Sequence, residues 1–204
     1  MEDAASSGFP TGLVFLGVVV MAGLWAVSIY NALVRARNHF KNAFAQIDVQ
    51  LKRRYDLIPN LVETVKGYMK HEEGTLTGVI EARNAAASAM KALAGDPTNA
   101  AALQSLGKAE GLLGNALGAL NVAFEAYPDL KADTQVQNLM EELTSTENKV
   151  GFSRQAFNDS VTSYNNAREV FPASMIAGIF GFGEAALLDI EFKEGERDAP
   201  KVSF

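Results

Sequence analysis

Four charged side chains interrupt apolar helical repeats in this sequence, and they are the first candidates for chemistry. Arg54, Glu110, Glu147 and Arg154 each stand where the repeat otherwise places an apolar residue. Two charges of each sign, brought together between helices, would form an ion-pair network that fixes helix register. The alternative is a polar site inside the protein, such as a metal held by paired carboxylates. We favour the structural network.

The sequence lacks the residues that enzymatic chemistry of the familiar kinds requires. A metal site between helices needs a Glu-x-x-His motif on each of two helices, and neither His39 nor His71 follows a glutamate by three residues. The absence of cysteine excludes disulfides, thiol nucleophiles and thiolate metal sites. The sequence has no pattern that would bring a serine, a histidine and a carboxylate together as a catalytic triad, and it contains no Walker glycine loop. We therefore expect no catalytic residue, cofactor or metal, and no enzyme activity.

Length and charge narrow the class of protein further. The chain has 204 residues, with 18 basic and 24 acidic side chains and a net charge of -6. This length suits one domain with an appendage. The acidic excess argues against a nucleic-acid-binding protein that works by neutralising phosphates.

The N-terminal part of the sequence is a candidate membrane anchor. No charged residue lies between Asp3 and Arg35, and residues 9–29 would span roughly 31 Å as a helix, close to the thickness of a bilayer's hydrocarbon core. A cleaved signal peptide begins with a basic segment, whereas the segment that precedes this apolar stretch is acidic. We expect a retained transmembrane anchor over residues 9–30, preceded by a short extracytoplasmic N-terminus over residues 1–8.

The charges that flank the anchor indicate its orientation. The amino side carries only acids, and basic residues follow the span at Arg35, Arg37, Lys41, Lys52, Arg53 and Arg54. Positive charge favours the cytoplasmic side. We expect a single-pass protein of the inner (cytoplasmic) membrane, with its N-terminus outside and its C-terminal domain in the cytoplasm.

The rest of the chain has the apolar spacing of helices throughout, so the predicted fold class is all-α. Apolar repeats predict long helices that end near residues 70, 93, 127 and 171, the second of them beginning near Thr75 as an N-cap. Short connections between long helices imply antiparallel neighbours. We expect residues 31–172 to form an up-down antiparallel four-helix bundle with coiled-coil-like helices, which continues the transmembrane helix.

Two features predict apolar surface that one copy covers poorly. The second helix is too short to reach Phe40, Phe44 and Ile47 on the first helix, which predicts a two-helix stalk that self-associates or binds a partner. Residues 173–183 form an uncharged, apolar, membrane-proximal segment that could rest on the membrane or pack on the stalk. Residues 184–204 are expected to be a mostly solvated acidic tail.

Four glycines on the third helix indicate a close-packing face. Gly107, Gly111, Gly114 and Gly118 are spaced by four, three and four residues. Each costs about 1 kcal/mol relative to alanine inside a helix, and the close approach of another helix could offset that cost. The partner could be a neighbour in the same chain or a second copy.

Several motifs resemble the bacterial LemA family across nearly the whole chain. They are YNALVRARN at 30–38, QIDVQLKRRYDLIPNLVETVKGY at 46–68, EAYPDLKA at 125–132, STEN at 145–148, SYNNAREVFP at 163–172 and the closing PKVSF. The resemblance implies an N-terminal anchor, a helical bundle in the cytoplasm and no established catalytic activity. The family's distinctive polar positions, for which no role is assigned, are Arg53, Arg54, Asp56, Asn60, Glu63, Lys66, Glu147, Asn148, Tyr164 and Asn165.

The resemblance and the residues together give two hypotheses. The first is a non-enzymatic, membrane-anchored scaffold that forms homo-oligomers and organises or remodels membrane, or presents partners there. A relative in magnetotactic bacteria takes part in building magnetosome membranes, in line with this role. The second is an accessory factor in the envelope stress response, because genes of the family often accompany a membrane-bound zinc metalloprotease. The expected partners are the lipid bilayer, another copy and, under the second hypothesis, that protease.

Overall fold

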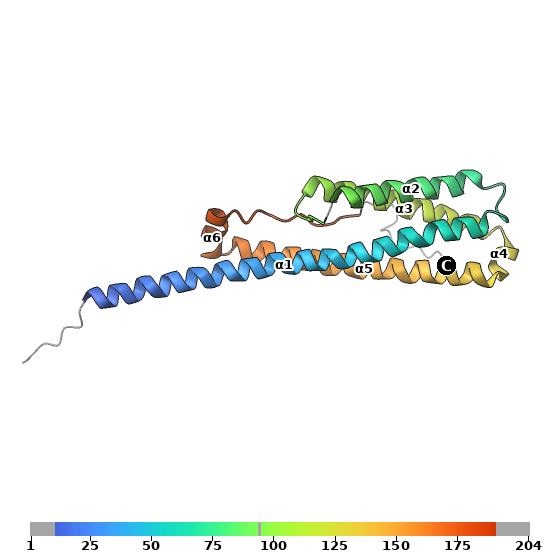
Figure 1. Ribbon diagram of the computed structural model, residues 1–204. Helices are drawn as coiled ribbons and strands as arrows, with labels where there is room; N and C mark the ends of the chain where they lie inside the picture. The colour runs from blue at the N-terminus through green and yellow to red at the C-terminus, as the bar shows by residue number, and fades with distance from the viewer. Residues whose placement is uncertain (1–10, 94, 191–204) are drawn as a thin grey trace, which may run out of the picture.

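A computed structural model describes residues 11–93 and 95–190, and these residues form helices and connections without a strand. This confirms the all-α prediction. Figure 1 shows the order and arrangement of the elements. The helices are α1 (Thr11–Val65), α2 (Glu73–Leu93), α3 (Ala100–Phe124), α4 (Pro128–Ala132), α5 (Thr134–Glu169) and α6 (Ala173–Phe180).

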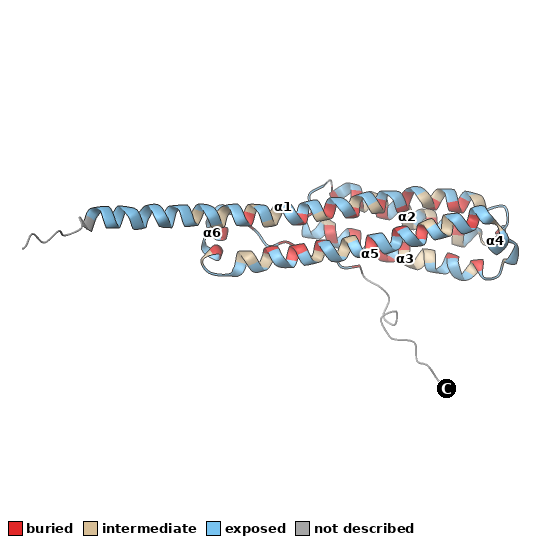
Figure 2. Cartoon of the chain, turned by 90° about the horizontal axis from the view of Figure 1, so that it is seen from below, coloured by how far each residue is buried: buried red, intermediate tan, exposed pale blue. Residues whose placement is uncertain are grey.

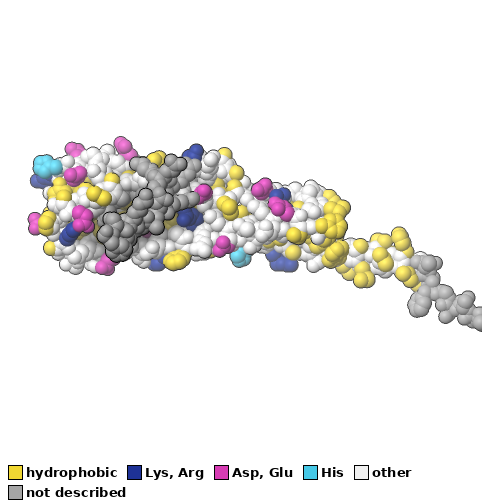
Figure 3. Space-filling view, turned by 180° about the vertical axis from the view of Figure 1, so that it is seen from behind, with side chains coloured by type: hydrophobic (Ala, Val, Ile, Leu, Met, Phe, Trp, Pro, Cys, Tyr) yellow, Lys and Arg dark blue, Asp and Glu magenta, His cyan; other side chains and the backbone are white. Residues whose placement is uncertain are grey.

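Helix α1 joins an apolar projecting part to the body of the molecule without interruption. It has 55 residues and contains Pro59, so it is roughly 80 Å long at 1.5 Å per residue. Its N-terminal part projects alone and is exposed (Figure 2), with hydrophobic side chains along it (Figure 3). This part is long and apolar enough to cross a membrane, and none of its most apolar window is buried.

The long helices associate as two close pairs. Helix α5 packs along α1, α3 packs along α2, and α2 also contacts α1. Aromatic rings join α1 to α5, with Phe44 and Phe157 at 5.5 Å between ring centroids and Phe40 and Tyr164 at 5.1 Å. The up-down antiparallel four-helix bundle stays a prediction, because α3 packs mainly on α2 and a groove lies between α3 and α5.

Side-chain caps explain where two of the helices begin. The Asn99 side chain accepts a hydrogen bond from the Ala102 N–H at 3.0 Å and caps α3. The Asp133 carboxylate accepts from the N–H groups of Gln135 and Val136 and caps α5. These bonds satisfy amide groups that have no partner within their own helix. The predicted N-cap at Thr75 is wrong, because α2 begins at Glu73 and Thr75 lies within it.

The seam of α1 nearest the projecting part is fully covered by this one chain. Leu33, Phe40, Phe44 and Ile47 are each at most 2% exposed. Helix α5 supplies much of the cover, and α6 also packs against α1. The prediction of a poorly covered two-helix stalk is therefore wrong, because it left out cover from the chain that follows α5.

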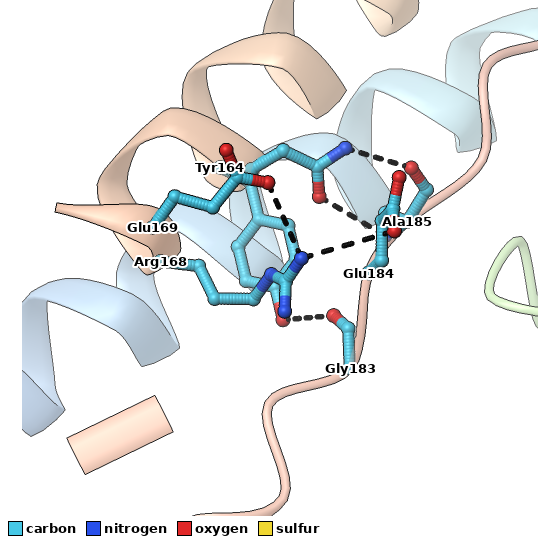
Figure 4. A network of polar contacts seen from close by, with 7 residues as sticks. Tyr164, Arg168, Glu169, Gly183, Glu184 and Ala185 are labelled. Atoms are coloured by element: carbon cyan, nitrogen blue, oxygen red, sulfur yellow. Dashed lines mark hydrogen bonds and ion pairs between the residues drawn. The ribbon is translucent and has the colours of Figure 1, made fainter. Parts of the chain in front are cut away.

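Part of that cover is an extended segment, residues 181–190, which returns along α5. The Asn165 side chain accepts from the Ala185 N–H at 3.0 Å and donates to the Ala185 carbonyl at 2.8 Å. Asn158 makes the same pair of bonds with Leu188, at 2.9 and 3.1 Å. Figure 4 shows this region, including the bond from the Tyr164 hydroxyl to the Gly183 carbonyl at 2.8 Å.

The spacing of the two asparagines along α5 matches the spacing of the two residues that they bind on the extended segment. Seven residues of helix separate Asn158 from Asn165, which is roughly 10.5 Å. Three residues of extended chain separate Ala185 from Leu188, which is roughly 10 Å. Each side-chain amide thus pairs with one residue's N–H and C=O, as a neighbouring strand would. The side chains of Ala185 and Leu188 are buried, so the prediction of a solvated tail is wrong for residues 184–190; residues 191–204 lie outside the described residues.

The asparagine bonds can be tested one at a time by amide hydrogen exchange of the full chain in detergent micelles. Asn165→Ala should speed exchange at the Ala185 amide, and Asn158→Ala at the Leu188 amide. Each substitution removes two hydrogen bonds, worth about 1 kcal/mol each. Asn166→Ala, at an exposed neighbouring position, is the control and should change neither amide. Equal exchange in all three variants would contradict the assignment.

Candidate functional site

The most buried polar cluster connects α1 to α3. Arg54 Nη1 donates to Glu110 Oε2 at 2.9 Å, and the two side chains are only 4% and 1% exposed. The Tyr55 hydroxyl donates to the other oxygen of Glu110. Glu147, which lies on α5 and is exposed, approaches Arg54 at 3.6 Å. The structure therefore brings together three of the four charges that interrupt the apolar stripes.

Burial governs the protonation of this cluster. Loss of water raises the pKa of the Glu110 carboxyl, while the Arg54 guanidinium and the Tyr55 hydrogen bond oppose that rise. Burial and the neighbouring Glu110 also raise the pKa of Tyr55, so its hydroxyl stays protonated and remains a donor. Arg54 Nη1 and the Tyr55 hydroxyl both face Glu110, which is the pattern of a contact between helices, while the buried Nε of Arg54 has no hydrogen-bond partner among the described residues.

Arg154 takes no part in this cluster. It follows Glu147 by seven residues on α5, which displaces it by roughly 10 Å along the helix. Within residues 11–93 and 95–190 it makes no ion pair. Glu147 lies close enough to approach Arg54, whereas Arg154 lies too far along α5 from Glu147 to join the same cluster.

The other polar positions carried over from the family resemblance have varied surroundings. Arg53 pairs with Glu142 of α5 at 2.5 Å on the surface, and Asp56 lies 3.9 Å from Arg83 of α2. Tyr164 and Asn165 hold the extended segment. The remaining side chains are exposed, and they belong to Asn60, Glu63, Lys66 and Asn148.

Sequence reasoning missed Tyr55 and Asn158, which complete these two groups of contacts. Tyr55 directly follows Arg54 inside the longest family motif and shares Glu110 with it. Asn158 lies seven residues before Asn165, so both fall on one face of the helix. A pair of asparagines at that spacing on one face was the available signal for a bound extended segment.

The glycine face of α3 has two different surroundings. A Cβ added at Gly107 would overlap the carbonyl oxygen of Asp189, so the extended segment, rather than a helix, approaches closely there. Gly111 is buried. At Gly114 and Gly118 a Cβ would meet no described atom of another element within 4 Å. Close helix packing against a described part of this chain is thus wrong for Gly114 and Gly118.

These two glycines instead line an open groove between α3 and α5. The groove has a volume of about 190 Å³. Its apolar lining comes from three helices, with Leu61 of α1, Leu117 and Leu120 of α3, and Met140 and Leu143 of α5. In the part of the chain that the structure describes, no three histidine, aspartate or glutamate side chains gather in a way that could hold a metal ion.

Replacement of Arg54 should show how much the buried pair matters. Arg54→Met leaves Glu110 buried without its cation and should cost about 3–5 kcal/mol of unfolding free energy. The control Arg53→Met removes an exposed pair, which is worth less than about 1 kcal/mol. Chemical denaturation of the full chain in micelles measures both. Equal losses of unfolding free energy in the two variants would contradict the burial of Arg54. The double variant Arg54→Met, Glu110→Met should recover most of the free energy lost in Arg54→Met alone.

The glycines should respond oppositely to alanine. Gly114→Ala should raise the unfolding free energy by up to about 1 kcal/mol, because alanine favours helix and has room there. Gly107→Ala should lower it, because the new methyl group displaces the backbone at Asp189. Thermal denaturation of both variants checks this, and a loss of stability in Gly114→Ala would show that another group occupies the groove.

Comparison with known proteins gives a consistent result. The family model described as LemA family matches residues 43–204. Protein LemA of Metamycoplasma hominis is 27% identical over 172 residues, covering 80% of this chain and 74% of the relative. Magnetosome protein MamQ of Magnetospirillum gryphiswaldense is 28% identical over 171 residues, covering 75% of this chain and 62% of that protein's length. The chain belongs to the LemA family.

Proposed function

We propose that this protein is a membrane-anchored scaffold without catalytic activity, which associates with further copies and organises membrane or presents partners there. The observation that carries the proposal is the continuity of α1, whose apolar exposed part runs into the body as one helix. A body fixed to its anchor in this way holds its surfaces at a set height and direction from the bilayer.

The chemistry of the buried polar groups supports a non-enzymatic role. Arg54 and Tyr55 both donate to Glu110, and the side chains of Asn158 and Asn165 are occupied by backbone groups. Catalysis needs polar groups that converge on a space where a substrate can sit. These five side chains instead join one element to another.

The surface of α3 and α5 supports association between copies. Gly114 and Gly118 carry a helix-propensity cost of about 1 kcal/mol each that no described contact offsets. Large apolar side chains on the same two helices are exposed, namely Leu112, Val122 and Phe152. A helix of a second copy laid in the groove would cover apolar lining and use the space that the glycines leave.

The relatives support a role at membranes. MamQ is named a magnetosome protein, and it shares with this chain an alignment that extends over most of the body. The basic residues that follow the apolar stretch favour the body on the cytoplasmic side of the inner membrane. Accessory service to a membrane protease stays a prediction, since no structural feature favours it.

Disulfide crosslinking tests the association, and the absence of native cysteine makes single-cysteine variants unambiguous. In native membranes, Val122→Cys beside the groove should crosslink two copies, whereas the control Glu81→Cys on α2 should not. Adding Gly114→Leu, whose Cβ meets no described atom of another element within 4 Å and whose side chain extends into the groove, should abolish the crosslink and leave the melting temperature nearly unchanged. A chain that stays monomeric and leaves liposomes unaltered would contradict the scaffold.

A further inference from the structure

We infer that α6 is a second lipid-contacting element, whose outer face lies in the interfacial layer of the membrane that α1 crosses. The inference rests on the anchor in the proposed function but does not need association between copies. Three independent features of the described residues carry it: the position of α6 on α1, the distribution of large and small side chains on α6, and the charges around it.

The first feature is position. Tyr30 lies near the C-terminal end of the uncharged stretch of α1, and its ring meets Phe180 of α6 at 4.9 Å and Phe182 at 5.5 Å between centroids. Helix α6 therefore stands beside the point where α1 would leave the hydrocarbon. Figure 3 shows hydrophobic side chains gathered where the projecting part of α1 joins the body. Aromatic side chains favour this depth of a bilayer.

The second feature is an inverted apolar pattern. Helix α6 buries Ala173 and Ala177, whereas Phe171 just before it, Met175 and Ile179 are 78%, 59% and 73% exposed. Met175 and Ile179 are spaced by four on α6 and form one stripe, and Phe171 precedes the helix. In water a helix gains more by burying its larger side chains, at about 25 cal/mol per Å² of apolar surface. The arrangement is favourable where the surroundings of the stripe are lipid.

The third feature is charge. No charged residue occurs from residue 170 to 183. The acids on either side, Glu169 and Glu184, both approach Arg168, at 3.4 and 3.9 Å (Figure 4). Arg37 lies over the Phe182 ring at 5.0 Å, and Arg35, two residues earlier on α1, is exposed. An apolar stripe beside basic side chains is the pattern of a helix that binds an anionic membrane surface.

Two contacts with lipid would restrict the body more than one. A single transmembrane helix can rotate about its own axis, and the body would rotate with it. Insertion of the stripe at Met175 and Ile179 on one side of α1 stops that rotation, and it adds volume to one leaflet only. The face of the body that carries α6 would then point toward the membrane.

Depth measurement by spin labelling of the full chain tests this inference. Single cysteines at Met175 and Ile179 would carry nitroxides in vesicles of phosphatidylcholine and phosphatidylglycerol. Val19→Cys on α1 is the control for lipid, and Ser145→Cys on α5, which is exposed, is the control for water. The collision rate with oxygen relative to a water-soluble nickel chelate should be several-fold higher at 175 and 179 than at 145.

Each other result has a defined meaning. Labels at 175 and 179 that resemble the label at 145 would overturn the inference while the anchor stands. Labels shielded from both oxygen and nickel would show that protein covers the stripe, which also overturns it. A label at 19 in water would overturn the anchor itself, and the inference with it. Because the labelled side chains are exposed, far-UV circular dichroism should match that of the parent chain.

Discussion

The packing of α5 against α1 is the contact on which the rest of the structure depends. Both helices are far longer than α2 and α3, and a stack of rings from Phe40, Phe44, Phe157 and Tyr164 lies between them. Aromatic pairs in edge-on geometry add about 0.5–1.5 kcal/mol beyond the area they bury. This pairing carries the end of α5 back toward the apolar part of α1, and so it sets where everything after Glu169 can lie.

The two halves of α1 in the body are held by different kinds of contact. Near the apolar stretch, aromatic and aliphatic side chains of α1 pack against α5, α6 and the extended segment. Farther along, Arg54 and Tyr55 reach Glu110 of α3. Since α3 packs chiefly on α2, this buried pair is a direct tie between the two helix pairs. Removing one partner would leave a charge in a low-dielectric place, whereas the apolar half tolerates changes that conserve volume.

The sequence predicted the features that depend on helical periodicity, and it missed the contacts that depend on the extended segment. Helical spacing placed the long helices within a few residues of their observed ends, and it identified Arg54, Glu110 and Glu147 as intruders in apolar stripes. It could not indicate the buried extended segment, because residues 181–190 have no repeat of their own. Their place is fixed by two asparagines on another element, and an asparagine on a helix face usually signals solvent.

The extended segment also changes the meaning of the glycines. At Gly107 the backbone of Asp189 occupies the place that a Cβ atom would take. Gly114 and Gly118, farther along the same face, border an open groove. One row of small residues therefore serves two purposes: its first part admits a strand-like segment of the same chain, and its second part leaves room beside Leu117 and Met140. The seam of α1 no longer argues for association between copies, since the chain covers it alone. The surface that favours such association is the α3–α5 groove, which lies at the opposite end of the body from α6.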